Sequence, residues 1–491
     1  MNVPRCMSTQ HPDNVQPPFF ADEPVLQGEA EVREAYYAYS HLGCTEQMWD
    51  FEGKEVDAFV VKKLLSRYEG FFREMRLGKD VFLTLRVPNP RVESLEAKVL
   101  LETLESIPRS YDIARRFYGE AAPVPIFEVI LPMTASAAEA NRVYHYYKDF
   151  VGGKEAQRCY DVTVRDWLGD FRPDTVNVIP LIEERSHLLG IDAIVREYAA
   201  DKDVPYLRVF LARSDPALNY GQVSAVLMVK VALQRLATLE RELALPIYPI
   251  LGAGSAPFRG NLRPPRVDDV LTEYPSVQTF SIQSAFKYDY PEPDVVAALA
   301  GINRTPRGIA REVDERACLR LIDKVSTRYA ECVTALAPLI NELAPLVPQR
   351  RARRLHIGLF GYSRELDGHR EVHLPRAIRF CASLYSVGLP PEVLGLSALD
   401  RSELALLREH YQNLDEDMAD SLRYLCEANL SKLPSIAREE AGAACEAFSC
   451  EPDQAHAALA QSLLADLRAR AGQDILTERI TRAAARRRFL G

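Results

Sequence analysis

The sequence predicts an α/β fold, a TIM-like (β/α)8 barrel with many additional helices and a helical C-terminal region. Short apolar segments alternate along the chain with longer segments whose apolar residues recur every three or four positions, as strands alternate with helices in a parallel barrel. Several short segments are almost continuously apolar, which is typical of strands buried on both faces. From residue 391 onward the chain carries helix signals and almost no strand signal.

The predicted elements follow from these patterns in chain order. Strands are predicted at residues 81–86, 126–131, 176–182, 206–211, 247–251, 277–282 and 356–360. Helices are predicted at residues 95–106, 136–150, 222–243 and 311–336. Prolines at 88, 90, 264 and 265 interrupt the pattern where loops are needed. Seven or eight such strand–helix units indicate a parallel sheet that closes into a barrel.

The C-terminal region is predicted to pack on this barrel. Between Pro391 and Arg482, Ala and Leu dominate, with Glu and Arg on the predicted outer faces of helices. No linker rich in Gly or Ser precedes it. We therefore expect a single domain of residues 1–491, with a barrel core of about residues 1–390 and a helical extension of about residues 391–491.

Composition excludes several classes of protein. The 491 residues are 47% hydrophobic and 26% charged, as in ordinary globular proteins. The formal net charge of −9 gives no general attraction to nucleic acid or to an anionic membrane, so we expect neither as a partner. No apolar run reaches the roughly 18 residues of a membrane span, and the N-terminus lacks the apolar core of a secretory signal. The nine cysteines form no Cys-x-x-Cys pair, which favours reduced thiols and a cytoplasmic location.

Polar residues follow the predicted strands at the ends where the active sites of barrel enzymes lie. They are Arg86, Glu183, Arg213, Ser214, Asp215, the loop 252–260 with Arg259, Gln283, Ser284, Lys287 and the segment 361–364 with Arg364. Any one of them fits an ordinary surface loop. Their recurrence after successive strands predicts a common site.

Two of these residues are candidate metal ligands. Glu183 and Asp215 come from different predicted strands and offer hard oxygen atoms, which suit Mg²⁺ or Mn²⁺. The alternative is that they cap loops or pair with Arg185 and Arg213.

Four arginines offer rigid forks for phosphate or carboxylate groups, namely Arg86, Arg259, Arg364 and Arg376. Ordinary pairing with surface carboxylates is the alternative. A metal together with several arginines indicates a small substrate with several negative charges. A nucleotide is disfavoured because the chain has no Gly-x-x-x-x-Gly-Lys-[Ser/Thr] loop.

His11 is the candidate general base. A lone histidine is usually structural, but the segment Ser-Thr-Gln-His-Pro-Asp-Asn around it is polar and ordered by proline. Such a segment could bring a group that titrates near neutral pH to the site. No Gly-x-Ser-x-Gly motif supports a serine hydrolase.

Several motifs together resemble archaeal-type phosphoenolpyruvate carboxylase, the short form of that enzyme. They are residues 6–14 (CMSTQHPDN), 176–183 (VNVIPLIE), 254–260 (GSAPFRG), 283–288 (QSAFKY), 361–364 (GYSR) and the chain end 488–491 (RFLG). The resemblance implies a carboxy-lyase that converts phosphoenolpyruvate and bicarbonate to oxaloacetate and phosphate, and so an anaplerotic supply of oxaloacetate. It also implies a barrel core, a divalent metal (Mg²⁺ or Mn²⁺) and a homotetramer arranged as a dimer of dimers.

The larger bacterial and plant enzymes share pieces of these motifs, and each match implies a role. The Thr-Gln-His-Pro-Asp stretch around His11 is similar to their Thr-x-His-Pro-Thr motif, which implies that His11 is catalytic. The stretch Pro-Leu-Ile-Glu that ends at Glu183 resembles their Pro-Leu-Phe-Glu. The stretch Arg-Ser-Asp-Pro around Asp215 resembles their Tyr-Ser-Asp-Ser. These two matches imply that Glu183 and Asp215 bind the metal.

The arginines are matched in the same way. Phe-Arg-Gly around Arg259 resembles the end of their glycine-rich loop, which implies that Arg259 is catalytic. Tyr-Ser-Arg364 and the Pro-Arg-Ala-Ile around Arg376 are similar to their substrate-binding pieces, and Leu-Thr-Leu-Arg86 resembles a strand-terminal Leu-Asp-Ile-Arg.

Departures from the larger enzymes change two expectations. Their glycine-rich loop carries a histidine and a further arginine that this chain lacks, and a lysine after the metal aspartate is replaced by Leu218. We therefore expect Lys287 or Arg213 to supply part of the phosphate contact. The loop that closes over the substrate as a lid is expected to include Gly252, Gly254, Ser255 and Gly260.

The resulting hypothesis is one reaction scheme. Bicarbonate attacks phosphorus, giving carboxyphosphate and an enolate of pyruvate bound to the metal on Glu183 and Asp215. His11 takes the carboxyphosphate proton, and Arg259 holds the CO₂ that the enolate attacks. Two alternatives stay open: a different metal-dependent carbon–carbon lyase on a similar barrel, and a non-catalytic helical binding or assembly protein.

Overall fold

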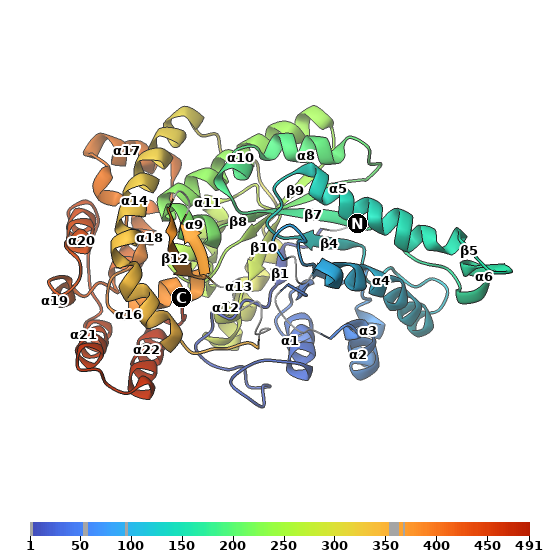
Figure 1. The fold of residues 1–491 in the computed structure, drawn as a ribbon, viewed down its shortest axis with the longest axis horizontal. Helices are drawn as coiled ribbons and strands as arrows, with labels where there is room; N and C mark the ends of the chain where they lie inside the picture. The colour runs from blue at the N-terminus through green and yellow to red at the C-terminus, as the bar shows by residue number, and fades with distance from the viewer. Residues whose placement is uncertain (1–2, 53–56, 94–96, 353–362, 367–368) are drawn as a thin grey trace.

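A closed barrel of eight parallel strands forms the centre of the computed structural model, which describes residues 3–52, 57–93, 97–352, 363–366 and 369–491 (Figure 1). Around the barrel in chain order, the strands are β1 (Cys6–Ser8), β2 (Glu46–Asp50), β3 (Phe82–Arg86), β4 (Glu128–Leu131), β7 (Asn177–Ile182), β8 (Leu207–Ala212), β9 (Ile247–Gly252) and β10 (Thr279–Ile282). Each neighbouring pair is parallel, including the pair of β1 and β10 that closes the barrel. The predicted TIM-like barrel is therefore confirmed.

Six of the predicted strands are confirmed, as β3, β4 and β7 to β10. The strand predicted at 356–360 lies outside the described residues. The pattern missed β1, which has only three residues, and β2, whose sequence Glu-Gln-Met-Trp-Asp places a carboxylate at each end. Both carboxylates of β2 are buried because each pairs with an arginine from another strand: Glu46 with Arg208 and Asp50 with Arg86.

The interior of the barrel is layered. Near the amino ends of the strands, Arg208 donates to Glu46 at 2.7 Å and to Glu128 at 2.9 Å, and all three side chains are buried. An apolar layer separates this ion-paired floor from the other end; its residues are Met7, Met48, Ile130, Ile179, Leu181, Phe210, Ala212 and Ile250. The ion pairs of Arg208 with Glu46 and Glu128 are costly to break, because removing one partner leaves the other charge buried without compensation. The carboxyl ends of the strands remain for a site.

Helices surround the barrel and fill its crossovers. They are α1 (Glu29–Ser40), α2 (Val60–Arg67), α3 (Glu69–Glu74), α4 (Ala97–Tyr118), α5 (Ala137–His145), α7 (Arg185–Leu188), α8 (Ile191–Ala199), α9 (Ser214–Tyr220), α10 (Gln222–Leu243), α11 (Val267–Glu273), α12 (Ser284–Tyr288), α13 (Glu292–Arg304), α14 (Glu315–Leu343) and α16 (Ala377–Ser386). The four helices expected from apolar periodicity are confirmed as α4, α5, α10 and α14.

Helix α10 is long and apolar enough to cross a membrane by length and composition alone. In the structure, 78% of its most apolar window is buried. It packs against α9 and α14, and Val226, Val229 and Leu233 are among its buried residues. This is the position of a core helix.

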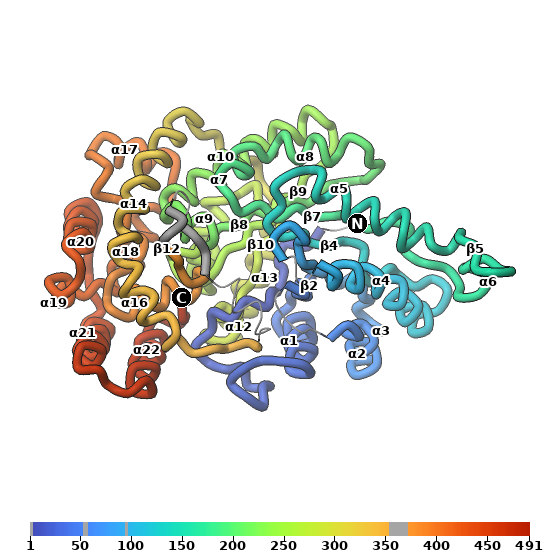
Figure 2. Tube along the Cα trace, viewed as in Figure 1, coloured from blue at the N-terminus to red at the C-terminus, as the bar shows by residue number. Residues whose placement is uncertain are grey.

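The C-terminal region is helical, as expected. Its helices are α17 (Arg401–His410), α18 (Leu414–Leu422), α19 (Glu427–Leu430), α20 (Ser435–Ala447), α21 (Gln454–Arg468) and α22 (Gln473–Arg487). They gather on one side of the barrel, as the orange and red tube of Figure 2 shows. The chain end returns to the core, because Phe489 and Leu490 are fully buried. A hairpin of β11 (Ser363–Leu366) and β12 (His369–Pro375) precedes this region.

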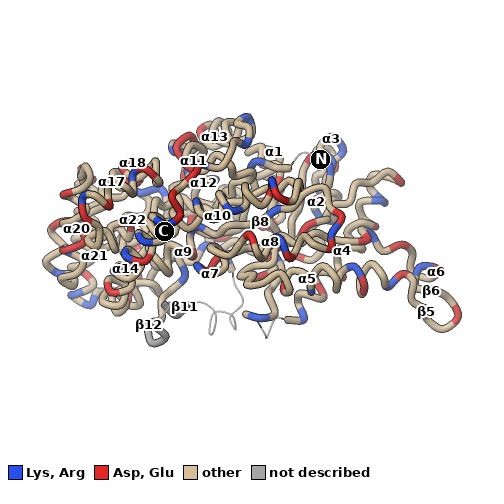
Figure 3. Tube along the Cα trace, turned by 90° about the horizontal axis from the view of Figure 1, so that it is seen from above, with Lys and Arg blue, Asp and Glu red and all other residues tan. Residues whose placement is uncertain are grey.

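An arm extends from the barrel at the opposite end from the C-terminal helices (Figure 2). It carries the short hairpin of β5 (Arg158–Cys159) and β6 (Val162–Thr163) and the helix α6 (Val164–Leu168). Basic and acidic residues are interspersed along the described chain in the view of Figure 3.

Candidate active site

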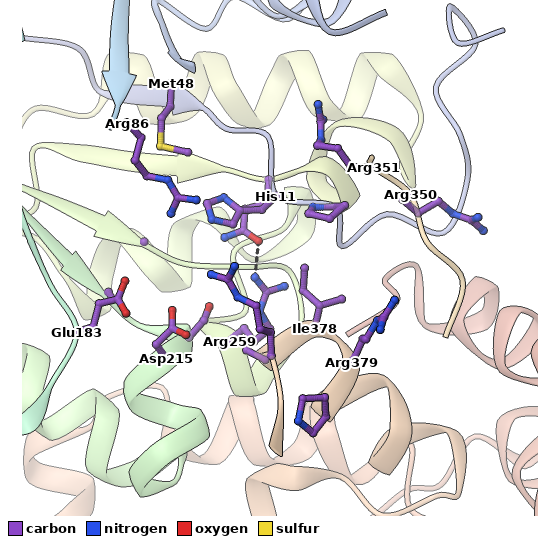
Figure 4. A pocket seen from close by; sticks show the side chains of 18 of the residues that line it. His11, Met48, Arg86, Glu183, Asp215, Arg259, Arg350, Arg351, Ile378 and Arg379 are labelled. Carbon is purple, nitrogen blue, oxygen red and sulfur yellow. Dashed lines mark hydrogen bonds between the residues drawn. The ribbon is translucent and has the colours of Figure 1, made fainter. Parts of the chain in front are cut away.

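A cavity of about 600 Å³ opens at the carboxyl ends of the barrel strands (Figure 4). The charged and polar side chains along it are His11, Arg86, Glu183, Ser214, Asp215, Arg259, Gln283, Gln349, Arg350, Arg351, Arg376 and Arg379. Six of these twelve are arginines, so the cavity suits an anion. Of the polar residues predicted to meet after successive strands, six line this cavity: Arg86, Glu183, Ser214, Asp215, Arg259 and Gln283.

Glu183 and Asp215 enter the cavity from neighbouring strands. Glu183 directly follows β7, and Asp215 lies in the first turn of α9, just after β8. Their carboxylates point into the cavity in Figure 4. Mg²⁺ is usually held by one or two carboxylates and completes its shell with water and substrate oxygens. This pair of oxygen donors in a roomy cavity therefore fits Mg²⁺ or Mn²⁺.

Arg86 is held rigidly at the end of β3. Its Nε and Nη2 donate to the two carboxylate oxygens of Asp50 at 2.8 and 2.9 Å, and Nη2 lies 2.7 Å from Glu52. Although burial opposes it, Asp50 and Glu52 raise the pKa of Arg86 above its usual value. The guanidinium is thus a fixed positive charge facing the cavity, and a bidentate pair sets its orientation.

Glu93 adds a titrating group to this cluster. Burial, and then the neighbouring carboxylate of Glu52, raises the pKa of Glu93 to about 8. The folded-state pKa of Glu93 lies above the unfolded value of about 4.3, so its contribution to the free energy of unfolding is fully present below pH 4. This contribution is lost as the pH rises toward 8. We expect Glu93→Gln to gain thermal stability relative to the native chain between pH 5 and pH 8. A difference in melting temperature between the two proteins that stays the same at every pH across that range would contradict this.

His11 reaches the cavity on the segment that follows β1. Thr9 anchors this segment, since its N–H donates to Ile282 O at 2.9 Å, and Ser284 N donates to His11 O at 3.2 Å. The ring is oriented by Thr9, whose Oγ1 lies 3.0 Å from His11 Nδ1. The polar N-terminal segment therefore enters the cavity wall, as the sequence led us to expect.

Arg259 is fixed by three oxygen acceptors from distant parts of the chain. It donates to Asp13 at 3.2 Å, to Gly491 O at 2.7 Å and to Gln283 at 2.6 Å. A side chain at position 254 would collide with the Arg259 guanidinium, because a Cβ there would lie 2.7 Å from Cζ. Gly254 thus lets Arg259 lie against the backbone.

The last residue of the chain is part of this arrangement. A Cβ on Gly491 would lie 2.1 Å from Ile378 O and 2.6 Å from Ala382 N, both in the backbone of α16. We expect Gly491→Ala to displace the chain end and to lower kcat/KM about ten- to a hundredfold, the value of a hydrogen bond to a charged group. Steady-state kinetics would check this, with Gly442→Ala, which meets nothing within 4 Å, as the control. Full kcat/KM in Gly491→Ala would show that Arg259 does not need this contact.

The structure does not present the predicted lid as an exposed flap. Residues 253–259 are buried, and Gly252 and Gly260 are half-buried. The backbone is pinned, since Gly254 N donates to Arg259 O at 2.9 Å, and Ser255 N lies 3.4 Å from Asp13. Of the four residues named for the lid, Gly252 alone lines the cavity. In this structure the segment forms part of the cavity wall, where Asp13 and the chain end pack against it, and its closure over a substrate stays a prediction.

Lys287 and Arg213 are not among the residues that line the cavity. Lys287 is fully buried and donates to Glu34 at 2.9 Å and to Thr9 O at 3.0 Å, so its charge is already compensated. Arg213 is buried as well and donates to Phe258 O at 3.2 Å, which supports the wall. Neither is placed to take the phosphate contact expected of it.

Of the remaining two arginines, the structure describes the side chain of one and not of the other. Arg376 precedes α16 and lines the cavity. Arg364 lies in β11, but its side chain is outside the described part of the chain. Both stay predictions for substrate binding.

Sequence reasoning missed Arg350, Arg351 and Arg379, which also line the cavity. The run Gln-Arg-Arg-Ala-Arg-Arg that contains the first two lies before the predicted strand 356–360, not after the carboxyl end of a strand, where active-site residues of barrels are expected. Arg379 lies one turn beyond Arg376 in α16, so helical spacing from Arg376 could have found it.

Comparisons with known proteins bear on the whole chain. The family model for phosphoenolpyruvate carboxylase matches residues 3–491. Curated proteins named phosphoenolpyruvate carboxylase are similar: 51% identical in Methanospirillum hungatei and 52% in Methanothermobacter thermautotrophicus, each covering 100% of both chains. A third, from Pyrococcus furiosus, is 54% identical over 86% of this chain and 88% of its own. Among solved structures, a malate synthase of Haloferax volcanii covers 70% of this chain and 90% of its own at 11% identity, with a TM-score of 0.37.

Proposed function

Because the chain belongs to the phosphoenolpyruvate carboxylase family, we propose that it carboxylates phosphoenolpyruvate with bicarbonate by way of carboxyphosphate and the enolate of pyruvate. One observation carries the proposal: a single cavity at the strand ends gathers two carboxylates, a histidine and six arginines. A trianionic substrate and a second anion need such a concentration of positive charge.

The arginines bind the two anions. Arg86 and Arg376 face the cavity and neutralise the phosphate and carboxylate of phosphoenolpyruvate, with Arg364 as a further candidate. Arg86 is fixed before substrate arrives, since Asp50 and Glu52 already hold it, so little reorganisation accompanies binding. Glu183 and Asp215 would hold Mg²⁺ or Mn²⁺, and when bound this cation would neutralise charge that develops on the phosphate and enol oxygens.

The chemistry proceeds in two stages. A bicarbonate oxygen attacks phosphorus, and the bond between phosphorus and the enol oxygen breaks, which yields carboxyphosphate and the enolate. His11 then takes the carboxyl proton of carboxyphosphate, and the bond between carbon and the bridging oxygen breaks to release CO₂ and phosphate. Arg259 holds the CO₂ while the enolate carbon attacks it and forms oxaloacetate. The rigid setting of Arg259 suits this role, because its three acceptors fix the guanidinium.

The cavity wall also protects the enolate. Met48, Leu181 and Phe210 line the cavity beside the polar groups. Their apolar surface reduces the water near the enolate, which would otherwise be protonated to pyruvate.

Phosphate release measured with and without bicarbonate tests the proposal. We expect phosphate and oxaloacetate to appear together and only when bicarbonate is present. A different carbon–carbon lyase would cleave its substrate without releasing phosphate. A binding or assembly protein would leave phosphoenolpyruvate unchanged.

The cellular and assembly features rest on the family relationship. We infer a cytoplasmic homotetramer, a dimer of dimers, that replenishes oxaloacetate, with residues 1–491 as one domain. The arm supports contact with a second copy, because Tyr160, Trp167 and Leu168 are 96%, 65% and 56% exposed there. Light scattering that gives the mass of a monomer would rule the tetramer out.

A further inference from the structure

We propose that Gln10, the residue before His11, is a positioning residue that sets the place of Arg86 and His11 in the cavity. The inference rests on the proposed carboxylation, in which Arg86 binds the substrate anion and His11 moves a proton. Gln10 itself is not among the cavity-lining residues, and its side chain is buried with 1% of its surface exposed. It acts through its neighbours.

The two ends of the Gln10 amide reach two different elements of the fold. Its Oε1 accepts a hydrogen bond from Asp50 N at 2.9 Å, at the last residue of β2. Its Nε2 donates to Glu31 at 3.3 Å, in helix α1 outside the barrel. The amide therefore spans from the barrel strand to the helix that covers it.

At the strand end, Gln10 controls the partner of Arg86. Asp50 grips Arg86 with both carboxylate oxygens, and in the strand register Asp50 lies directly opposite Arg86. Because the Arg86 guanidinium makes two hydrogen bonds to the Asp50 carboxylate, it must move when that carboxylate moves. A shift of the Asp50 backbone would thus move the guanidinium in the cavity.

At the helix end, Gln10 is anchored to a set of compensated charges. Arg351 donates to Glu31 at 2.7 Å and to Glu34 at 2.6 Å, and Lys287 pairs with Glu34. These two cations and two anions are almost completely buried, so the cluster is costly to rearrange. A neutral amide can join this balanced set to the Asp50 backbone, whereas an added charge would upset it.

Gln10 also fixes His11 through the backbone. The residue before Gln10 is held on both sides, since Thr9 N donates to Ile282 O and Lys287 donates to Thr9 O. The residue after it is held by Ser284 N, which donates to His11 O. With the side chain of Gln10 also fixed, the peptide that carries the imidazole has little freedom to tilt.

Gln10→Met tests the proposal, because methionine keeps the length and removes both hydrogen bonds. We expect KM for phosphoenolpyruvate and the dissociation constant of inorganic phosphate, measured by calorimetry without turnover, to rise about tenfold, or about 1.4 kcal/mol. The ratio of pyruvate to oxaloacetate should rise as well, since His11 is misplaced. Gln278→Met is the matched control. Gln278 is a buried glutamine directly before β10, and its side chain donates to Val3 O. If Gln10→Met does not fold, Gln10→Asn, shorter by one methylene, takes its place.

Gln10→Glu supplies a second readout. The charged and titratable groups around position 10 include His11, Glu31, Glu34, Asp50, Arg86, Arg351 and Lys287. A carboxyl introduced beside Glu31 has a raised pKa, and its protonated form can make both hydrogen bonds of the native amide. We expect the KM of Gln10→Glu, divided by that of the native chain at the same pH, to fall as pH is lowered from 8 to 6.

Two results would overturn the inference. One is phosphate affinity in Gln10→Met within twofold of the native value. The other is a loss equal to that of Gln278→Met, which would mean a general effect of removing a buried amide. Either can occur while the native chain still releases phosphate only with bicarbonate, so this inference can fail although the proposed function holds.

Discussion

Replacing Glu183 or Asp215 with alanine is expected to lower turnover at least about a thousandfold, or about 4 kcal/mol in barrier height. The two carboxylates enter one cavity from neighbouring strands, and they are the oxygen donors that we assign to Mg²⁺ or Mn²⁺. Removing either leaves the phosphate and enol charges without that neutralisation, although the arginines remain. We expect the fold to persist, because both residues follow strands and belong to neither the apolar layer nor the ion-paired floor.

Titration calorimetry with Mn²⁺ checks this prediction apart from turnover. Glu184→Ala is the matched control, since Glu184 is the next residue along the chain and its side chain is 51% exposed. We expect Mn²⁺ affinity to fall in Glu183→Ala and Asp215→Ala and to stay unchanged in Glu184→Ala. Native affinity in both cavity variants would remove the metal assignment.

His11→Asn is expected to divert the reaction from oxaloacetate to pyruvate. Asparagine cannot take the carboxyphosphate proton, so CO₂ release should slow by about a hundredfold or more. The first stage needs only the arginines and the cation, so phosphoryl transfer should continue. The stranded enolate is then protonated, and phosphate appears in step with pyruvate.

All three products in one reaction mixture decide between this role and a structural one. Bicarbonate-dependent phosphate release with little oxaloacetate supports His11 as the base. If His11 only pins the N-terminal segment through Thr9 and Ser284, both activities should fall together, or the melting temperature should fall instead. A variant that forms oxaloacetate at the native rate would exclude His11 from the mechanism.

The parts of the fold that depend on local patterns could be predicted from the sequence. Strands β7, β8 and β9 are nearly continuous apolar runs, and α10 and α14 carry helical periodicity, so apolar spacing predicts them. Strand β2 was missed because its end residues are carboxylates, and their burial depends on arginines that lie far along the chain. Local pattern cannot show such a compensation.

The candidate site divides in the same way. Glu183, Asp215 and Arg86 could be placed because each lies at or just beyond the end of a predicted strand. Lys287 also follows a strand, but its side chain turns away to Glu34, a contact across 253 positions in the sequence. The support of Arg259 by Gly491 spans 232 positions, and spacing in the sequence does not show that these two residues meet.

The most direct test of the account follows oxygen from bicarbonate. If a bicarbonate oxygen attacks phosphorus, the product phosphate must carry one oxygen that entered as bicarbonate, and the new carboxylate of oxaloacetate must carry the other two. With ¹⁸O-labelled bicarbonate, mass spectrometry of the phosphate should therefore find one labelled oxygen per turnover. Phosphate without the label would contradict carboxyphosphate as the intermediate, because its oxygens would then come from the substrate and water alone.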